Sequence, residues 1–352
     1  MMKSTFFSIT RENLKLALKA SDLPQFAADQ LFSWVYKHFE FDLEKMSNVS
    51  QKVKAFVLDH YDFSLPKIVW QGKSKDGTRK FLLAMADGQT IETVLIPAKD
   101  NRQTLCVSSQ VGCAIGCKFC HTGTMGLKRN LTAGEVVGQY MLVSQLLNQD
   151  EEAGHKISNI VYMGQGEPLH NFDNMKDATV ILMDAKGIAL GQRKITLSTS
   201  GLVPQIEKLG DFPPINIAIS LHAAHDNIRT SLMPINKAYD LTRLLQAIKK
   251  IPLKAHRWIT YEYILIEGLN DRQEDIDALV QLLNKKESKI NIIPFNEYPD
   301  GPFKRPTDRV IDWFQGELNA RGIVCTVRVT KGGDILAACG QLKSEFEKLN
   351  LW

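Results

Sequence analysis

From residue 104 onward, short apolar runs alternate with helical patterns, and this alternation limits the fold more than any other feature of the sequence. The strand-like runs are Thr104–Ser108, Ile157–Met163, Lys194–Ser200, Asn216–Ser220, Trp258–Ile266, Lys289–Pro294 and Val324–Val329. The helical patterns between them cover Thr132–Asn148, Phe172–Ala185, Leu241–Ile251, Gln273–Leu283 and Asp308–Ala320. A repeated strand–helix–strand order predicts parallel β/α units in a full or partial barrel, with the chemistry at the carboxyl ends of the strands.

The first part of the chain has a different pattern. In residues 1–60 the apolar positions recur at helical spacing, whereas residues 67–98 contain three strand-like runs separated by the turn sequences KDG and ADG. We therefore expect an α/β protein in which a small α+β accessory domain, residues 1–98, precedes a partial parallel (β/α)6-type barrel, residues 99–352. The basic side chains of the first hairpin are expected to be exposed and available to nucleic acid: Lys73, Lys75, Arg79 and Lys80.

The composition indicates the cellular compartment of the protein more clearly than its binding partner. No apolar stretch reaches the roughly 20 residues needed to cross a bilayer, and the first residues, MMKSTFFSITRENLKLALKA, lack the apolar region of a signal peptide. We therefore expect a cytoplasmic protein whose 6 cysteines serve as ligands or catalysts rather than as disulfides. A net charge of +4 permits an RNA partner without requiring one.

A glycine-rich loop after the first barrel strand, GCAIGCKFCHTGTMG, carries Cys113, Cys117 and Cys120. Thiolates are ligands for zinc and for iron–sulfur clusters. A structural zinc site normally has four ligands in two pairs, and the sequence offers no second pair, because Cys325 and Cys339 are distant and not spaced as one. A 4Fe–4S cluster held by three cysteines leaves one iron open to a small molecule. The spacing favours the cluster, and zinc is the alternative.

Polar residues and glycines stand where the other apolar strands end. The sequence GQGEP would let the backbone approach a ligand closely at Gly166 and would supply an acceptor at Glu167. Each such residue alone is typical of a turn or a cap, but their gathering at one barrel mouth indicates contacts to the small molecule. The candidates are Gly166, Glu167, Ser198, Ser220, Leu221, His222 and Asn296.

Several motifs together resemble one enzyme family. CVSSQVGC, CKFC, MGQGEPL, LSTSGLVP, SLHA, LMPIN and AACGQL, between Glu92 and Leu342, are similar to the adenine-specific RNA methyltransferases of the radical S-adenosylmethionine superfamily. The resemblance implies a 4Fe–4S cluster and two molecules of S-adenosylmethionine per turnover. It implies methylation of carbon 2 of an adenosine in 23S rRNA and in tRNA, with electrons from a donor such as a flavodoxin.

The same resemblance implies roles for three further residues. Cys339 would accept a methyl group from one cofactor molecule by displacement. A radical derived from a second cofactor molecule would take hydrogen from that methyl group, and the resulting carbon radical would add to the adenine ring. Cys106 would then release the product by forming a disulfide with Cys339, and Glu92 would remove the ring proton. A radical route suits an adenine ring carbon, because this carbon has no lone pair with which to attack a methylsulfonium; the cofactor carries that chemistry.

Two alternatives stay open at this point. The same machinery would methylate carbon 8 in the related resistance enzymes, although Val111 resembles the carbon-2 group. A non-catalytic RNA-binding protein with a structural metal would need neither Cys106 nor Cys339. In each case we expect a monomer without membrane contact. Cys325 is expected to pack in the core on one face of a strand with Ile323 and Val327, and the role of His121 is open.

RNA binding is expected from the reaction, since the target base must be unpaired or extruded from its stack. Basic residues assigned to the rim of the barrel would neutralise phosphates: Lys118, Lys128, Arg129, Arg193, Lys194, Arg229, Arg305 and Arg328.

Overall fold

The computed structural model describes residues 3–98, 102–149, 156–252, 257–299 and 301–344. Within them, one ten-stranded sheet has the order β14-β13-β12-β11-β10-β9-β6-β5-β4-β3. The strands from β6 to β14 in this order pair in parallel: β6 (Arg102–Cys106), β9 (Lys156–Tyr162), β10 (Ile195–Thr199), β11 (Asn216–Ser220), β12 (Ile259–Leu265), β13 (Ser288–Pro294) and β14 (Val324–Val327). Because β14 and β3 are the two ends of this order, the sheet does not close, and the predicted partial barrel is confirmed.

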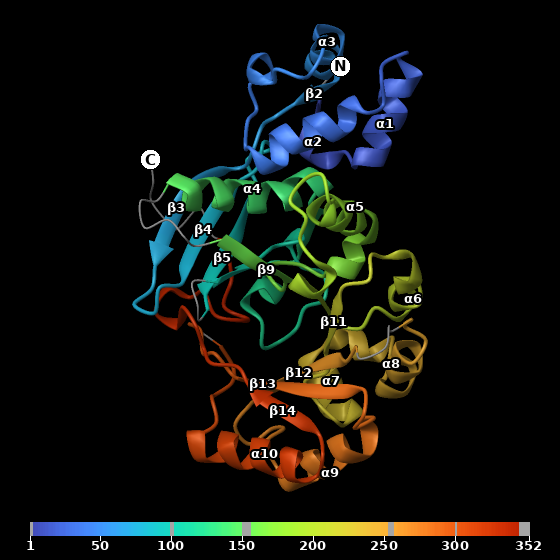
Figure 1. Cartoon of the computed structure of the whole chain (residues 1–352). Coiled ribbons are helices and arrows are strands. Elements are labelled where there is room, and N and C mark those ends of the chain that lie inside the picture. The colour runs from blue at the N-terminus through green and yellow to red at the C-terminus, as the bar shows by residue number, and fades with distance from the viewer. Residues whose placement is uncertain (1–2, 99–101, 150–155, 253–256, 300, 345–352) are drawn as a thin grey trace.

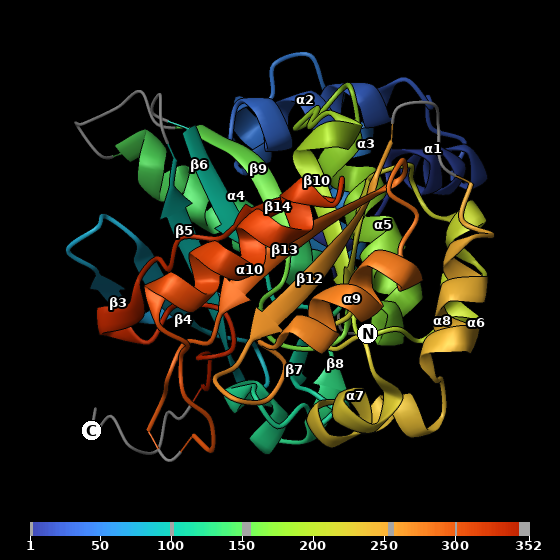
Figure 2. The same ribbon diagram turned by 90° about the horizontal axis from the view of Figure 1, so that it is seen from below.

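Every helix predicted for the barrel is present, with ends that differ by a few residues at most. The bounds are α4 (Ala133–Gln149), α5 (Phe172–Met183), α8 (Leu241–Ile248), α9 (Gln273–Leu282) and α10 (Asp308–Ala320). Figure 2 shows α8, α9 and α10 along the outer face of the strands. Two short helices were not predicted, α6 (Val203–Ile206) and α7 (Asp226–Leu232), because each is too short for its apolar period to stand out.

The N-terminal helices cover one end of the barrel. They are α1 (Arg11–Ala20), α2 (Ala27–Lys37) and α3 (Gln51–His60), and the short parallel pair β1 (Ser4–Thr5) and β2 (Tyr61–Asp62) joins their ends. Figure 1 shows them above α4 and α5. Their buried side chains belong to the same apolar cluster as those of the barrel, and Arg11 forms an ion pair of 2.8 Å with Asp184 beyond α5.

The strands β3 (Lys67–Lys73), β4 (Arg79–Ala84) and β5 (Thr90–Pro97) continue the barrel sheet. They pair antiparallel to one another, and β5 pairs antiparallel to β6. The boundary predicted near residue 98 adjoins residues 99–101, which lie outside the described residues, so the division into domains 1–98 and 99–352 stays a prediction. No helix in the described part of the chain is long and apolar enough to cross a membrane.

Lys80, a basic residue of the first hairpin that was expected to be exposed, is buried. Lys73 and Lys75 are exposed and Arg79 is half-buried, whereas only 8% of Lys80 is exposed. The expectation of an exposed Lys80 is wrong because β4 is an interior strand of the sheet, and its face at Lys80 is covered by residues near Leu336.

Candidate active site

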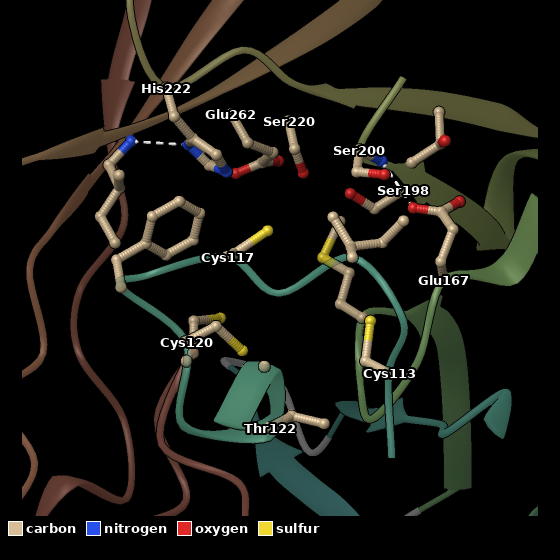
Figure 3. Close-up of a pocket in the computed structure, with 18 of the residues that line it drawn as sticks. Cys113, Cys117, Cys120, Thr122, Glu167, Ser198, Ser200, Ser220, His222 and Glu262 are labelled. Atoms are coloured by element: carbon tan, nitrogen blue, oxygen red, sulfur yellow. Dashed lines mark hydrogen bonds between the residues drawn. The ribbon is translucent and has the colours of Figure 1, made fainter. Parts of the chain in front are cut away.

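A small antiparallel hairpin holds the loop that carries the three cysteines. Its strands are β7 (Gln110–Gly112) and β8 (Leu127–Asn130), which pair across the base of the loop. Cys113, Cys117 and Cys120 all line one cavity of about 910 Å³ at the carboxyl ends of the parallel strands. Figure 3 shows their side chains across the cavity from polar side chains of β10, β11 and β12.

The three thiols fit an iron–sulfur cluster. Burial is the main cause that raises the pKa of Cys113 to about 12, and burial also raises the pKa of Cys117 and of Cys120. Bound iron would offset this cost, because a metal ion deprotonates a coordinating thiol. Among the described residues, no three His, Cys, Asp or Glu side chains are arranged to hold one metal ion. A cubane cluster binds each thiolate at a different iron atom, so its ligands need not converge on one point.

A polar wall faces the cysteines. Ser198 on β10 and Ser220 on β11 are half-buried and line the cavity. Glu262 on β12 completes the wall and was not predicted (Figure 3). Its carboxylate accepts a hydrogen bond of 2.9 Å from Asn291 Nδ2, and burial raises its pKa. The available signal was a single carboxylate inside the apolar strand ITYEYIL.

The GQGEP turn after β9 is held against the rest of the barrel mouth. Glu167 is buried, and its carboxylate accepts hydrogen bonds from the backbone N–H of Leu169 at 3.0 Å and of Ser200 at 2.7 Å. Burial raises the pKa of Glu167, and these hydrogen bonds oppose the rise. Gly166 has a φ of 96°, and a Cβ there would lie 2.5 Å from Cβ of Gln110. The close approach that this glycine permits is therefore to the chain itself, while Gly166 and Glu167 also line the cavity.

His222 and Leu221 connect β11 to its neighbour. His222 Nδ1 accepts a hydrogen bond of 3.0 Å from the backbone N–H of Ile264, and burial lowers the pKa of His222 to about 3, so the ring is neutral. Its ring packs edge-on against Phe119 of the cysteine loop at 4.7 Å. The side chain of Leu221 is fully buried, and its backbone N–H donates to the carbonyl of Glu262.

The prediction that Arg229 lies on the rim of the barrel is wrong. It is fully buried, since its guanidinium donates to the backbone carbonyls of Leu221, Ser200 and Ser220 at 2.8–3.1 Å and to Asn236 Oδ1 at 2.7 Å. Every residue has a backbone carbonyl, so the sequence does not show which of them will accept hydrogen bonds from an arginine. Arg229 therefore fastens together the ends of β10 and β11, which carry the polar wall.

The other basic residues are distributed unevenly. Lys118, Lys128 and Arg305 are exposed. Arg193 and Lys194 precede β10 and so lie at the end of the strand opposite the cavity. This corrects their assignment to the rim. Arg129 is held by Glu135 at 2.8 Å and by Asp87 at 2.6 Å.

The segment that carries Cys339 lies directly on the cysteine loop. The backbone N–H of His121 donates to the carbonyl of Gly340 at 2.7 Å, and Thr122 Oγ1 donates to the carbonyl of Leu342 at 2.6 Å. Asn296, beyond the end of β13, donates from Nδ2 to the carbonyl of Cys339 at 3.1 Å. These bonds place Cys339 at the edge of the cysteine-lined cavity.

A second cavity of about 840 Å³ adjoins the first and contains the other catalytic candidate, Cys106. Cys106 ends β6 and is buried, and burial raises the pKa of its thiol to about 12. Cys339 and Arg328 line both cavities, whereas Asn296 lines only the second of the two. Cys106 and Cys339 are 233 residues apart in sequence, and the structure places both at the wall of this second cavity.

Glu92 lies on β5 and is 5% exposed. Lys80 Nζ is 3.0 Å from Glu92 Oε1, while Oε2 is buried and has no hydrogen-bond partner among the described residues. Burial raises the pKa of Glu92 and the charge of Lys80 opposes the rise. Glu92 is thus a buried carboxylate with a cation at one oxygen and a backbone contact from Lys343.

Two remaining expectations concern single residues. The prediction that Cys325 packs in the core is confirmed, since it is 4% exposed and belongs to the main apolar cluster. His121 stacks on Tyr298 with ring centres 4.8 Å apart. The roles predicted for Cys339, Cys106 and Glu92, for the cluster ligands and for the cofactor contacts stay predictions.

This fold and this cysteine loop define a class of enzyme. Residues 107–283 match the Radical SAM superfamily, and residues 5–59 match the Ribosomal RNA large subunit methyltransferase N-terminal domain. A crystal structure of a radical SAM methyltransferase from Sphaerobacter thermophilus, 41% identical, covers 97% of this chain and 100% of its own, with a TM-score of 0.89.

Curated relatives narrow the class further. The dual-specificity RNA methyltransferase RlmN of Cereibacter sphaeroides is 44% identical over 351 residues, which is 97% of this chain and 89% of the relative. That of Syntrophotalea carbinolica is 45% identical over 338 residues, 96% of this chain and 89% of the relative. The chain belongs to this RlmN family of radical SAM methyltransferases, whose cofactors are a 4Fe–4S cluster and S-adenosylmethionine.

Proposed function

We propose that this methyltransferase acts on carbon 2 of an adenosine in 23S rRNA and in tRNA, as a cytoplasmic monomer that receives electrons from a donor such as a flavodoxin. The observation that carries the proposal is the position of Cys339, which lines both the cysteine-lined cavity and the cavity of Cys106. The dual-specificity name of the relatives supports RNA as the substrate class and favours this reading over carbon-8 methylation and over a purely structural metal.

The cofactors have a suitable place in the first cavity. Cys113, Cys117 and Cys120 would hold the cluster, and S-adenosylmethionine would lie against the polar wall. When bound, these groups supply the methyl group and the hydrogen-abstracting radical. The chain's own contribution is a set of fixed donors and acceptors around that space, which lowers the reorganisation needed when the cofactor binds.

Three residues of the chain would act on the methyl group and the base. Cys339 would carry the methyl group on its sulfur, at the junction of the two cavities. Cys106, in the second cavity, would attack that sulfur at the end of the reaction, so that an S–S bond forms as the S–C bond to the RNA breaks. The electron pair would leave with the released carbon, which takes up a proton and becomes the methyl group, and cytosolic thiols would then reduce the disulfide. Glu92 would take the ring proton on Oε2, because Oε1 is held by Lys80.

The test is anaerobic reconstitution of the purified protein with iron and sulfide, followed by S-adenosylmethionine, a reductant and unmodified 23S rRNA or tRNA. Nucleosides are then compared by mass spectrometry with 2-methyladenosine and 8-methyladenosine. We expect 2-methyladenosine from both RNAs, its loss in Cys339→Ala and its retention in the core control Cys325→Ala. An 8-methyl product would overturn the assigned carbon, and product from one RNA alone would overturn dual specificity.

A further inference from the structure

The ammonium group of Lys80 connects two parts of the site. Its Nζ lies 3.0 Å from Glu92 Oε1 and donates a hydrogen bond of 3.2 Å to the carbonyl of Leu336, three residues before Cys339. The same Nζ lies 5.6 Å above the ring of Trp70 on β3. Lys80 is 8% exposed, so these contacts replace most of the water that a lysine normally binds.

The register of the sheet explains how these groups meet. Lys80 is the cross-strand partner of Val94, and Val94 is the partner of Cys106 on the next strand. Cross-strand partners share a face of the sheet, and so do residues two apart on one strand, which adds Glu92 to this face. Val94 and Cys106 pack there with Ala337 and Leu342 of the Cys339 segment. Lys80, Glu92 and Cys106 therefore lie beneath the segment that carries Cys339.

The turn of the β3–β4 hairpin, which also carries Lys80, forms hydrogen bonds with the segment that carries Cys339. Ser74 Oγ donates to Asp334 Oδ1 at 2.6 Å, and the backbone N–H of Gly332 donates to Asp76 Oδ2 at 2.9 Å. The carbonyl that Lys80 binds belongs to Leu336, which has a φ of 51°, a region that non-glycine residues seldom adopt. Lys80 thus binds the segment at a strained position that needs support from its surroundings.

The surroundings of Glu92 determine whether its carboxyl group is ionised, and a nearby cation favours the ionised form. Gln165 accepts a hydrogen bond from the backbone N–H of Glu92, and the backbone of Lys343 adds a favourable contact to the carboxylate. Burial favours the protonated form of Glu92, and the charge of Lys80 favours the ionised form. A proton acceptor must be ionised before it acts, so the cation decides how much of the base is usable at neutral pH.

We propose that Lys80 is a positioning residue, which keeps Glu92 ionised and fixes the Cys339 segment above it through the carbonyl of Leu336. The assignment of Glu92 as the base rests on the proposed function. The ionisation of Glu92 and the anchoring of the segment do not, because they concern the chain alone.

The first test measures the protonation of Glu92 in the full-length protein without RNA. The infrared band of the protonated carboxyl, assigned by its absence in Glu92→Gln, is followed against pH. We expect the midpoint in Lys80→Met to rise by about 1–3 pH units, with Lys80→Arg close to the wild type. Lys75→Met, which removes an exposed lysine of the same hairpin, is the control and leaves the midpoint unchanged. An unchanged midpoint in Lys80→Met would overturn the electrostatic part of the proposal.

Lys80→Gln carries the same test if Lys80→Met does not fold, since glutamine is neutral but can still donate to the Leu336 carbonyl. Hydrogen exchange tests whether Lys80 anchors the Cys339 segment. The amides of residues 332–342 should exchange faster in Lys80→Met than in Lys80→Gln. Equal protection in all variants would refute the anchoring.

In methylation assays, raising the pH should restore the activity of Lys80→Gln, and Lys80→Arg should be active at neutral pH. If the wild type itself makes no methylated adenosine, the proposed function fails while the two measurements without RNA still decide the role of Lys80.

Discussion

Asn296 Nδ2 donates a hydrogen bond of 3.1 Å to the carbonyl oxygen of Cys339, and Asn296 Oδ1 accepts one of 2.8 Å from Thr330 Oγ1. The amide thereby links the end of β13, the chain after β14 and the segment that carries Cys339. A cofactor contact by Asn296 stays a prediction, whereas its hydrogen bond to Cys339 is present in the structure and restrains the segment that carries this cysteine.

Asn296→Ala should loosen the Cys339 segment while the fold remains intact. Loss of one such hydrogen bond costs about 1 kcal/mol, so alkylation of Cys339 by iodoacetamide, mapped by mass spectrometry, should become several-fold faster. The matched control is Asn319→Ala, which removes a similar amide bond of 3.2 Å to the carbonyl of Cys325 far from the segment. Equal alkylation rates in Asn296→Ala and wild type would refute the restraint.

Replacement of any one of Cys113, Cys117 and Cys120 by Ala should lower the iron and sulfide bound after anaerobic reconstitution and abolish reductive cleavage of S-adenosylmethionine. A cluster held by two thiolates has lost one of its three protein ligands and is bound less firmly. Cys325→Ala should retain the iron content of the wild type, because Cys325 lies in the core. Bound zinc in place of iron, or full iron in the three variants, would contradict the assignment.

Alkylation of Cys106 should depend steeply on pH. Burial raises the pKa of Cys106 to about 12, so at neutral pH the group is a thiol rather than the reactive thiolate. Its alkylation rate in the protein without cofactor should therefore rise by about tenfold per pH unit between pH 7 and 9. If the rate levels off below pH 9, the pKa of Cys106 lies below 9. The charge of Arg328 or another group would then lower this pKa by more than burial raises it.

Arg229→Met should destabilise the protein strongly. The substitution leaves several buried carbonyls without a donor, and we expect a loss of at least about 3 kcal/mol in the free energy of unfolding. Urea denaturation gives this value. The exposed Arg243→Met should cost less than about 1 kcal/mol. In the folded fraction of Arg229→Met, weaker binding of S-adenosylmethionine would confirm that Arg229 orders the polar wall; affinity equal to that of the wild type would limit its role to stability.

The periodicity of the sequence was enough to predict most elements of the barrel. Seven strands and five helices of the barrel follow from apolar runs and helical spacing. The cap that begins α4 is equally local, since it joins Thr132 and Glu135 by bonds of 2.9 and 3.2 Å. These features depend on neighbours in the chain, so their signals are local.

Two of the errors concern charged residues in the interior. Lys80 and Arg229 have side chains typical of a surface, and each is buried because its partners come from distant segments: Leu336 for Lys80, and Ser200 and Ser220 for Arg229. No local pattern marks a lysine that will face a carboxylate on the next strand or an arginine that will meet backbone carbonyls. Such burial is stable only when the whole set of partners is assembled.

The sequence by itself determined the cysteine spacing, the order of strands and helices and the polar residues at the strand ends, because these are properties of short stretches. Only the tertiary structure decided that the Cys339 segment lies on the cysteine loop, through Thr122 and Leu342, 220 residues apart, and over the Lys80–Glu92 pair. The reason is physical: a hydrogen bond between segments so far apart in sequence depends on the sheet register that brings them together.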